Sequence, residues 1–107
     1  MKKKIFLIGP TPGVASEYEI CATELRNMGY AVVNPFDFID TNLADYQVDQ
    51  YLRKCTMEMC KCDKVVTLMG WDQYVQSAAL VILARKLMFD VESIIKYMRP
   101  NAQTING

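Results

Sequence analysis

The side chains in this sequence that could carry out acid–base chemistry are carboxylates and tyrosines, because the chain contains no histidine. A serine or cysteine nucleophile would therefore lack its usual base. The acidic and phenolic groups expected near strand ends, where they could act as general acids or bases, are Glu17, Tyr18, Asp37, Asp72 and Tyr74. Each of them could equally be a helix cap or a solvated side chain.

With no histidine in the chain, a zinc-type metal site would need all four cysteine thiolates: Cys21, Cys55, Cys60 and Cys62. The last three form a C-x4-C-x-C pattern, which matches no standard zinc spacing. Free cysteines are commonly small buried hydrophobic residues, and helical spacing directs Cys55 and Cys62, but not Cys60, toward the core. We therefore predict no metal site and expect the cysteines to be reduced.

An apolar run at residues 65–69 stops abruptly at Gly70-Trp71-Asp72. Such a run is typical of a central strand buried on both faces. In open α/β sheets, ligands bind at the carboxyl ends of the strands. We therefore predict that Gly70, Trp71 and Asp72 form part of a site wall. The Trp71 ring could stack on a base or another ring, or it could pack as a lid over the core.

A second candidate for the site is the loop Gly9-Pro10-Thr11-Pro12-Gly13, which follows an apolar strand pattern at residues 4–8. It contains neither the G-x-G-x-x-G fingerprint nor a P-loop. The loop precedes a helix whose predicted capping box is Ser16 with Glu19. Backbone donors at a helix N-terminus favour an anion, which predicts a phosphate or sugar here. The alternative is a rigid turn with Thr11 exposed.

Strand and helix patterns alternate along the sequence and must position these residues. We expect strands at 4–8, 30–33, 65–69 and 89–91, helices at about 16–28, 44–61 and 73–88, and a last segment at 93–98. This order implies right-handed βαβ units, hence a parallel sheet of four or five strands with helices on both faces. The chain is predicted to be a single α/β domain over residues 1–107, with a tail from about residue 100.

Two helices carry apolar patterns that predict what they contact. In the first helix the apolar stripe is expected to be Ile20, Cys21, Leu25 and Met28, with Gly29 as the C′ residue. In the third helix, residues 78–84 show no polar face, which is typical of a helix buried on every side. Because the domain is small, we expect a partner copy to cover the region Ala78–Leu87 and the protein to be a homo-oligomer.

The charge and hydropathy of the chain exclude some classes of partner. Lys+Arg and Asp+Glu are both 12, so no net field attracts nucleic acid polymers or an anionic membrane. The basic residues at 2–4 precede only four apolar residues, fewer than the roughly 7–15 of a signal-peptide core. No run approaches the ~18 apolar residues of a membrane span. We expect a cytoplasmic protein without a membrane partner.

Four segments, read in order, resemble the short branch of the nucleoside 2-deoxyribosyltransferase-like superfamily: Ile8–Gly13, Gly29–Pro35, Cys62–Val66 and Gly70–Asp72. The resemblance implies a flavodoxin/Rossmann-like three-layer sandwich and a homo-oligomer. It also implies a site for a nucleoside or nucleoside monophosphate. We expect no cofactor. In that superfamily a glutamate attacks the anomeric carbon and the base is released, much as in retaining glycosidases.

The resemblance carries over to the predicted binding positions. The first loop would lie under the sugar and phosphate, and the ends of the second and third strands would complete the site. The predicted ligand-binding residues are Gly9, Pro10, Thr11, Gly13, Asn34, Pro35, Asp37, Gly70, Trp71 and Asp72.

The catalytic positions differ from the superfamily pattern. Ile82 occupies the position of the nucleophilic glutamate, and Cys55 replaces an assisting aspartate. An isoleucine cannot attack a sugar, and no cationic neighbour is evident that would activate Cys55. The resulting hypothesis is a catalytically silent binding or interaction domain. The alternatives are an active N-glycoside hydrolase or transferase that uses displaced carboxylates such as Asp37 or Asp72, and a structural homo-oligomer without a ligand.

Overall fold

Strands and helices alternate in the computed structural model, which describes residues 2–10, 15–38 and 48–98. The elements are β1 (Lys4–Ile8), α1 (Ala15–Asn27), β2 (Ala31–Val33), the 3-10 turn η1 (Pro35–Asp37), α2 (Val48–Met59), β3 (Lys64–Thr67), the 3-10 turn η3 (Trp71–Gln73), α3 (Val75–Lys86) and β4 (Asp90–Ser93). A helical turn at residues 95–98 follows β4. The predicted start of the second helix, near residue 44, lies outside the described residues.

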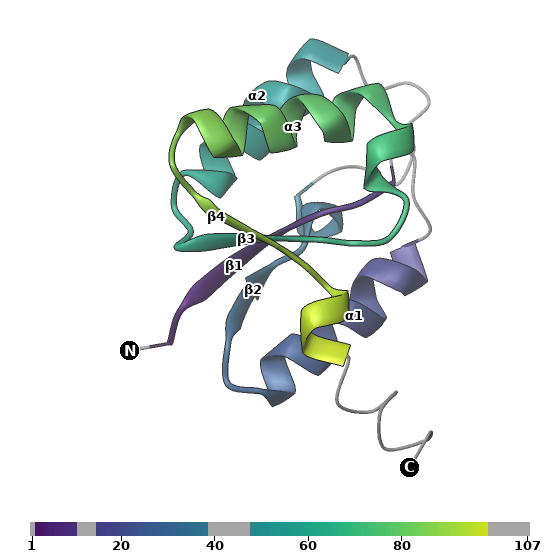
Figure 1. Ribbon diagram of the computed structural model, residues 1–107, viewed down its shortest axis with the longest axis vertical. Coiled ribbons are helices and arrows are strands. Elements are labelled where there is room, and N and C mark those ends of the chain that lie inside the picture. Colours follow the sequence, from purple (N-terminus) through teal and green to yellow (C-terminus); the bar gives the residue numbers. More distant parts are fainter. Residues whose placement is uncertain (1, 11–14, 39–47, 99–107) are drawn as a thin grey trace.

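The four strands form one parallel sheet in the order β2-β1-β3-β4 (Figure 1). Ile8 pairs with Thr67, and Thr67 pairs with Ser93, so three strands end at the same edge of the sheet. One further hydrogen bond, from the N–H of Leu68 to the carbonyl of Ile8 at 2.8 Å, extends the pairing beyond the strands. This confirms the predicted parallel α/β sheet.

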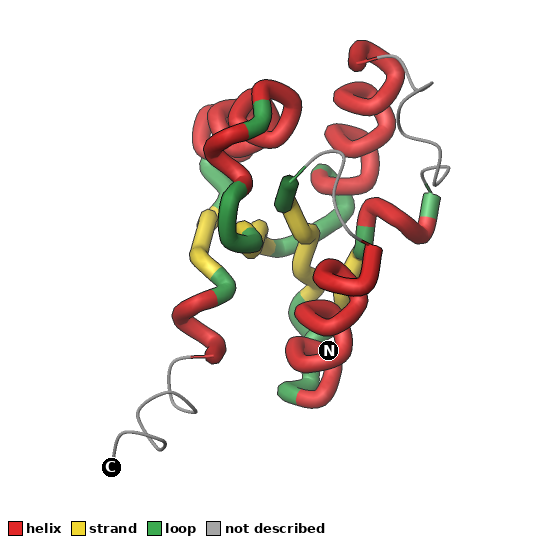
Figure 2. The backbone as a smooth tube through the Cα atoms, turned by 90° about the vertical axis from the view of Figure 1, so that its right-hand side faces the viewer, coloured by secondary structure: helices red, strands yellow, loops and turns green. Residues whose placement is uncertain are grey.

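Helices cover both faces of the sheet, with α2 and α3 on one face and α1 on the other (Figures 1 and 2). Successive strand side chains point to opposite faces. Phe6 and Ile8 therefore join the cluster under α2 and α3, whereas Ile5 and Leu7 join the cluster under α1. These two layers of apolar contacts confirm the predicted three-layer arrangement.

The buried stripe of α1 differs from the predicted one. Ile20 and Met28 are 62% and 46% exposed, whereas Tyr18, Ala22 and Leu25 are buried. The spacing of four and then three residues places these three on one helical face. Tyr18 can be buried because its hydroxyl donates to the carbonyl of Pro10 at 2.9 Å. The prediction gave weight to the most hydrophobic residues and missed a tyrosine with an internal partner.

The ends of α1 are partly as predicted. Gly29 has φ of +98°, a conformation that favours glycine, and it follows the helix as the predicted C′ residue. The predicted capping box at the other end is wrong in register. The helix already includes Ala15, so Ser16 lies inside its first turn instead of preceding it.

The orientation of the cysteines in and after α2 is confirmed. Cys55 and Cys62 are buried in the cluster under α2 and α3, and Cys60 is exposed. Burial raises the pKa of Cys55 to about 12, although a hydrogen bond with Tyr51 opposes the shift. Cys55 is therefore a protonated core residue at neutral pH.

Helix α3 starts two residues later than predicted, because residues 71–73 form η3. It is not buried on every side within the chain. Ser77, Leu80, Val81 and Ala84 are buried, but Ile82 on the outer side is 59% exposed. No helix in the described part of the chain is both long enough and apolar enough to cross a membrane.

A polar network joins β3, β4 and the turn at residues 95–98. The ammonium group of Lys64 lies 3.0 Å from the carboxylate of Glu92 and 3.2 Å from the hydroxyl of Tyr97. The Tyr97 hydroxyl and Lys96 also donate to Glu92. Lys64 further lies over the Tyr30 ring, 5.6 Å from its centroid. The network anchors the segment after β4 to the sheet.

Candidate functional site

The crossovers change direction between β1 and β3 at the carboxyl edge of the sheet. The connection from β1 to β2 runs through α1, whereas the connection from β2 to β3 runs through α2 on the opposite face. In open α/β sheets a crevice for ligands forms at such a switch point. The topology therefore favours a site beside the ends of β1 and β3.

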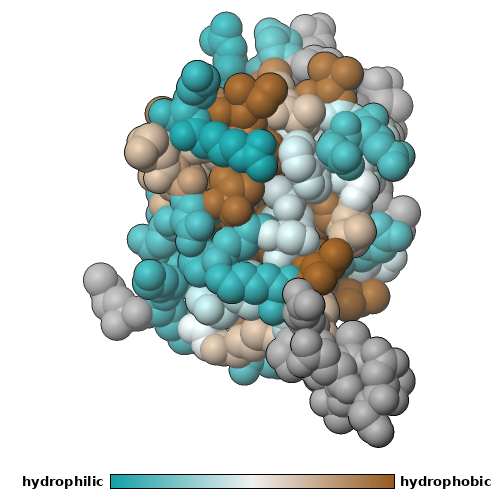
Figure 3. All heavy atoms as spheres, in the orientation of Figure 1, coloured by the Kyte–Doolittle hydropathy of each residue, from teal (hydrophilic) through white to brown (hydrophobic). Residues whose placement is uncertain are grey.

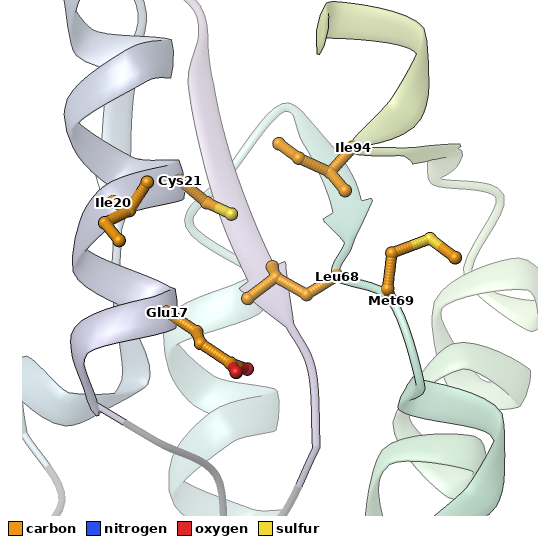
Figure 4. Close-up of a pocket in the computed structure, with 6 residues that line it drawn as sticks. All are labelled: Glu17, Ile20, Cys21, Leu68, Met69 and Ile94. Atoms are coloured by element: carbon orange, nitrogen blue, oxygen red, sulfur yellow. The ribbon is translucent and has the colours of Figure 1, made fainter.

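A hollow of about 300 Å³ lies on the α1 side of this edge (Figure 4). Its volume is at the lower end of the roughly 300–1,000 Å³ of small-molecule sites. Helix α1 supplies three lining residues, spaced so that they share one face. The segment after β3 supplies two, and the residue after β4 supplies one. The lining residues are Glu17, Ile20, Cys21, Leu68, Met69 and Ile94.

The described walls of this pocket are mostly apolar, and Glu17 is the only charged residue among the described residues that line it. Figure 4 shows the Glu17 carboxylate and the Cys21 sulfur both directed from α1 toward the strand ends. Burial, and then the negative charges of Glu17 and Glu24, raise the pKa of the Cys21 thiol. Cys21 therefore contributes a neutral, weakly polar surface and no thiolate nucleophile.

Beside this pocket, Gly9 allows the end of β1 to pack closely against α1 and the segment after β3. A Cβ placed on Gly9 would lie 2.9 Å from Oη of Tyr18 and 3.0 Å from Cβ of Leu68. The Gly9 carbonyl accepts a hydrogen bond from the buried hydroxyl of Ser77, and the Pro10 carbonyl accepts one from Tyr18. Gly9 and Pro10 thus join β1 to α1, α3 and the end of β3. Thr11 and Gly13, also predicted as ligand-binding, lie outside the described residues.

The predicted residues after β2 form the cap of η1. The side-chain oxygen of Asn34, which is 1% exposed, accepts from the N–H of Phe36 at 3.0 Å, while its amide donates to Glu19 at 3.2 Å. Asp37 accepts from the N–H of Asn34 at 3.4 Å, which completes a capping box with Pro35 buried between them. Both ends of the Asn34 amide are thus engaged within this end of the sheet, whereas Asp37 contributes one oxygen to the cap and its side chain is 57% exposed.

The predicted wall at Gly70-Trp71-Asp72 lies next to the first loop but faces the other side of the sheet. Gly70 has φ of +85°, and a Cβ added to it would lie 3.6 Å from Cγ of Pro10. Trp71 is half-buried against the cluster under α2 and α3. Its packing is that of a lid over the core. Asp72 is exposed on η3.

The two catalytic positions implied by the superfamily resemblance are not at the pocket. Cys55 lies on α2 and points into the cluster between α2, α3 and the sheet, and Ile82 is exposed on α3, whereas the pocket lies on the α1 side. Among the residues that the structure describes, no group of three His, Cys, Asp or Glu side chains could hold a metal ion. Of the described residues that line the pocket, Glu17 is the one carboxylate that could take part in acid–base or recognition chemistry.

Sequence reasoning had considered Glu17 as an acid–base candidate but had assigned the other five lining residues to the core or to no role. Leu68 and Met69 were part of an apolar run, and only Leu68 is buried; Met69 is 64% exposed. The combination of Glu17, Ile20 and Cys21 at helical spacing was the available signal, since it places a carboxylate, an alkyl group and a thiol together. Ser77 was likewise missed as the residue that fixes α3 to Gly9.

The model of a protein family described as a domain of unknown function (DUF4406) matches residues 3–93 of the chain. The matched range includes every strand of the sheet and helices α1 to α3. It also includes all residues that line the pocket except Ile94. No curated protein matches the chain.

Proposed function

Because the chain belongs to this DUF4406 family, whose activity is not known, we propose a function from the pocket itself: the domain binds a nucleoside without transferring its sugar. The observation that carries the proposal is the hollow of about 300 Å³ at the switch point of a parallel sheet. The resemblance to the nucleoside 2-deoxyribosyltransferase-like superfamily supports a nucleoside as the ligand.

The chemistry of the pocket walls supports a ligand that combines a ring with hydrogen-bond donors. Ile20, Leu68, Met69 and Ile94 offer apolar surface for the faces of a ring. The Glu17 carboxylate only accepts hydrogen bonds when ionised, so it suits the N–H and O–H groups of a base or sugar. A nucleoside presents both kinds of surface.

The absence of sugar transfer rests on the same geometry. Retaining glycoside chemistry requires a nucleophile and a second group that acts as acid and then as base. Among the described residues, Glu17 is the only carboxylate that lines the pocket. Asp37 is engaged in the cap of η1, and Asp72 is exposed on η3. Within the described part of the chain, the alternative of an enzyme with displaced carboxylates therefore has one candidate group at the pocket, Glu17, and no second carboxylate that lines it.

We expect a panel of the four 2′-deoxynucleosides to raise the melting temperature of the protein, because a ligand that binds only the folded state stabilises it. In Met69→Ala, loss of an exposed wall of the pocket should weaken binding roughly tenfold. Met57→Ala is the matched control, since Met57 and Met69 are 58% and 64% exposed but Met57 lies on α2. Titration by differential scanning fluorimetry measures each effect.

Chromatography of the same mixtures measures release of the free base. We expect none. Release that a pocket substitution abolishes would replace this proposal by the enzymatic alternative. A melting temperature unchanged by every nucleoside and nucleotide would favour the structural homo-oligomer.

The outer face of α3 supports a partner that is a second copy of the chain. We define this face as Val75, Ala78, Ala79, Ile82, Arg85 and Lys86. Val75 and Ile82 lie two turns apart on one side of the helix and are 81% and 59% exposed. Figure 3 shows apolar side chains among polar ones where α3 crosses the molecule.

This face is complementary to itself when two copies of α3 pack antiparallel. Ala78 and Ala79 then lie near the two-fold axis, where small side chains allow close approach, and Val75 of each copy contacts Ile82 of the other. The basic residues are in the last turn of α3, and Asp72 precedes the helix. Antiparallel packing therefore brings Arg85 of one copy toward Asp72 of the other, which supports an isologous dimer.

We expect Ile82→Glu to convert this dimer into a monomer, because two carboxylates would be placed in an apolar contact. Analytical ultracentrifugation should show at least a hundredfold weaker association. Ile95→Glu is the control, since Ile95 is also exposed, at 47%, but lies on the turn after β4. Sedimentation of the unsubstituted protein as a monomer at every concentration, or an undiminished dimer in Ile82→Glu, would contradict the proposed face.

A further inference from the structure

The charge distribution at the pocket discriminates between ligands that share the same ring and sugar. Among the described residues that line it, Glu17 is the only charged one, and none is cationic. Nucleotide sites usually supply arginine, lysine or free backbone donors for the phosphate. This pocket instead presents a carboxylate, which points from α1 into the hollow (Figure 4).

Glu17 also lies near the helix N-terminus of α1, where a bound phosphate would be stabilised. It lies in the first turn of α1, where the partial positive charge of the helix N-terminus favours one anion. The Glu17 carboxylate is that anion. A monophosphate bound beside it would place up to two further negative charges next to a carboxylate with no neutralising side chain among the lining residues.

We propose that Glu17 is the specificity residue of the pocket, and that it selects uncharged nucleosides over nucleoside monophosphates. This inference rests on the proposed function and names the substrate class of the same site. The carboxylate accepts hydrogen bonds from the ligand's N–H or O–H groups and repels its phosphorylated form. Cys21, one turn further along α1, remains a neutral thiol, so it adds no charge to that of Glu17.

Isothermal titration calorimetry with each 2′-deoxynucleoside and its 5′-monophosphate tests the proposal at low ionic strength, where repulsion is least screened. We expect the unsubstituted protein to bind at least one nucleoside ten or more times more tightly than its monophosphate. In Glu17→Gln, which keeps the shape but removes the charge, we expect this ratio to fall by about tenfold, mainly through tighter binding of the monophosphate.

Glu24→Gln is the matched control, because it removes one negative charge from the same helix at a residue that does not line the pocket. We expect it to leave the ratio unchanged. Equal or tighter binding of the monophosphate to the unsubstituted protein would overturn the role of Glu17 while leaving the proposed function intact. An unaltered ratio in Glu17→Gln would do the same. Binding of neither class of ligand would overturn the proposed function itself.

Discussion

Replacing Glu92 with glutamine is expected to lower the free energy of unfolding by about 2–3 kcal/mol at neutral pH. Glu92 and Lys64 form an ion pair at 3.0 Å, and their side chains are only 12% and 13% exposed. Glutamine keeps the shape and can still accept a hydrogen bond, but it leaves the Lys64 ammonium group poorly solvated and without a counter-charge. Urea denaturation at pH 7 measures the loss.

The acid sensitivity of the protein should change with the same substitution. Burial alone would raise the pKa of Glu92, but hydrogen bonds from Lys96, Tyr97 and Lys64 lower it from 4.5 to about 2. A carboxyl group whose pKa is lower in the folded state stabilises the fold above its unfolded pKa. That stability is lost as the pH falls from about 4.5 to 2. In Glu92→Gln this part of the acid transition should disappear.

Glu58→Gln is the matched control for Glu92. Glu58 also pairs with a lysine, at 3.1 Å, but its partner Lys61 is 59% exposed, so the pair is screened by water. We expect a loss of at most about 0.5 kcal/mol. Similar losses for Glu58→Gln and Glu92→Gln, or an unaltered acid transition in Glu92→Gln, would show that the Lys64–Glu92 pair contributes no more than a surface pair.

The sequence predicted the sheet because a strand that is buried on both faces consists of consecutive apolar residues, a pattern that is visible locally. β1 coincides with the predicted range at Lys4–Ile8, since its residues after Lys4 are all apolar and all buried. The alternation of strand and helix patterns then left a parallel sheet as the simplest arrangement. No comparable local pattern in the sequence indicated the Lys64–Glu92 pair. Its members are 28 residues apart, and each alone reads as an ordinary charged surface residue.

The site was harder to predict because the pocket lies on one face of the sheet, whereas the most distinctive predicted residue packs against the other. The sequence indicated the edge at which the pocket lies, where Gly70 approaches Pro10, but could not show which helix would leave space beside it. Trp71 was the most distinctive residue there, yet its ring packs over the core on the α3 side. The pocket is on the α1 side, because Tyr18 packs between α1 and the sheet while Ile20 is exposed at the pocket. That choice depends on the rotation of α1, which hydrophobicity alone predicted incorrectly.

The contact that fixes this rotation leads to a second large expected effect, from Gly9→Ala. The added methyl group would lie 2.9 Å from Oη of Tyr18 and 3.0 Å from Cβ of Leu68. Leu68 Cβ is attached to the backbone of a paired strand end and cannot swing away, so either β1 or α1 must shift. We expect a loss of about 1–3 kcal/mol in the free energy of unfolding, typical of an overpacked core. Urea denaturation provides the measurement.

A double-mutant cycle with Tyr18→Phe identifies the cause of the loss. Tyr18→Phe alone should cost about 1 kcal/mol, because the Pro10 carbonyl loses its 2.9 Å hydrogen bond. In that background the atom nearest to the new methyl group is gone, so Gly9→Ala should cost less than it does alone. Additive losses would mean that the contacts left in this background, with Cβ of Leu68 and Cζ of residue 18 at 3.0 Å, oppose the methyl group. Since Leu68 lines the pocket and Tyr18 lies on the helix that carries Glu17, a non-additive result would identify the Tyr18 hydroxyl as the contact that sets the distance between α1 and the strand ends.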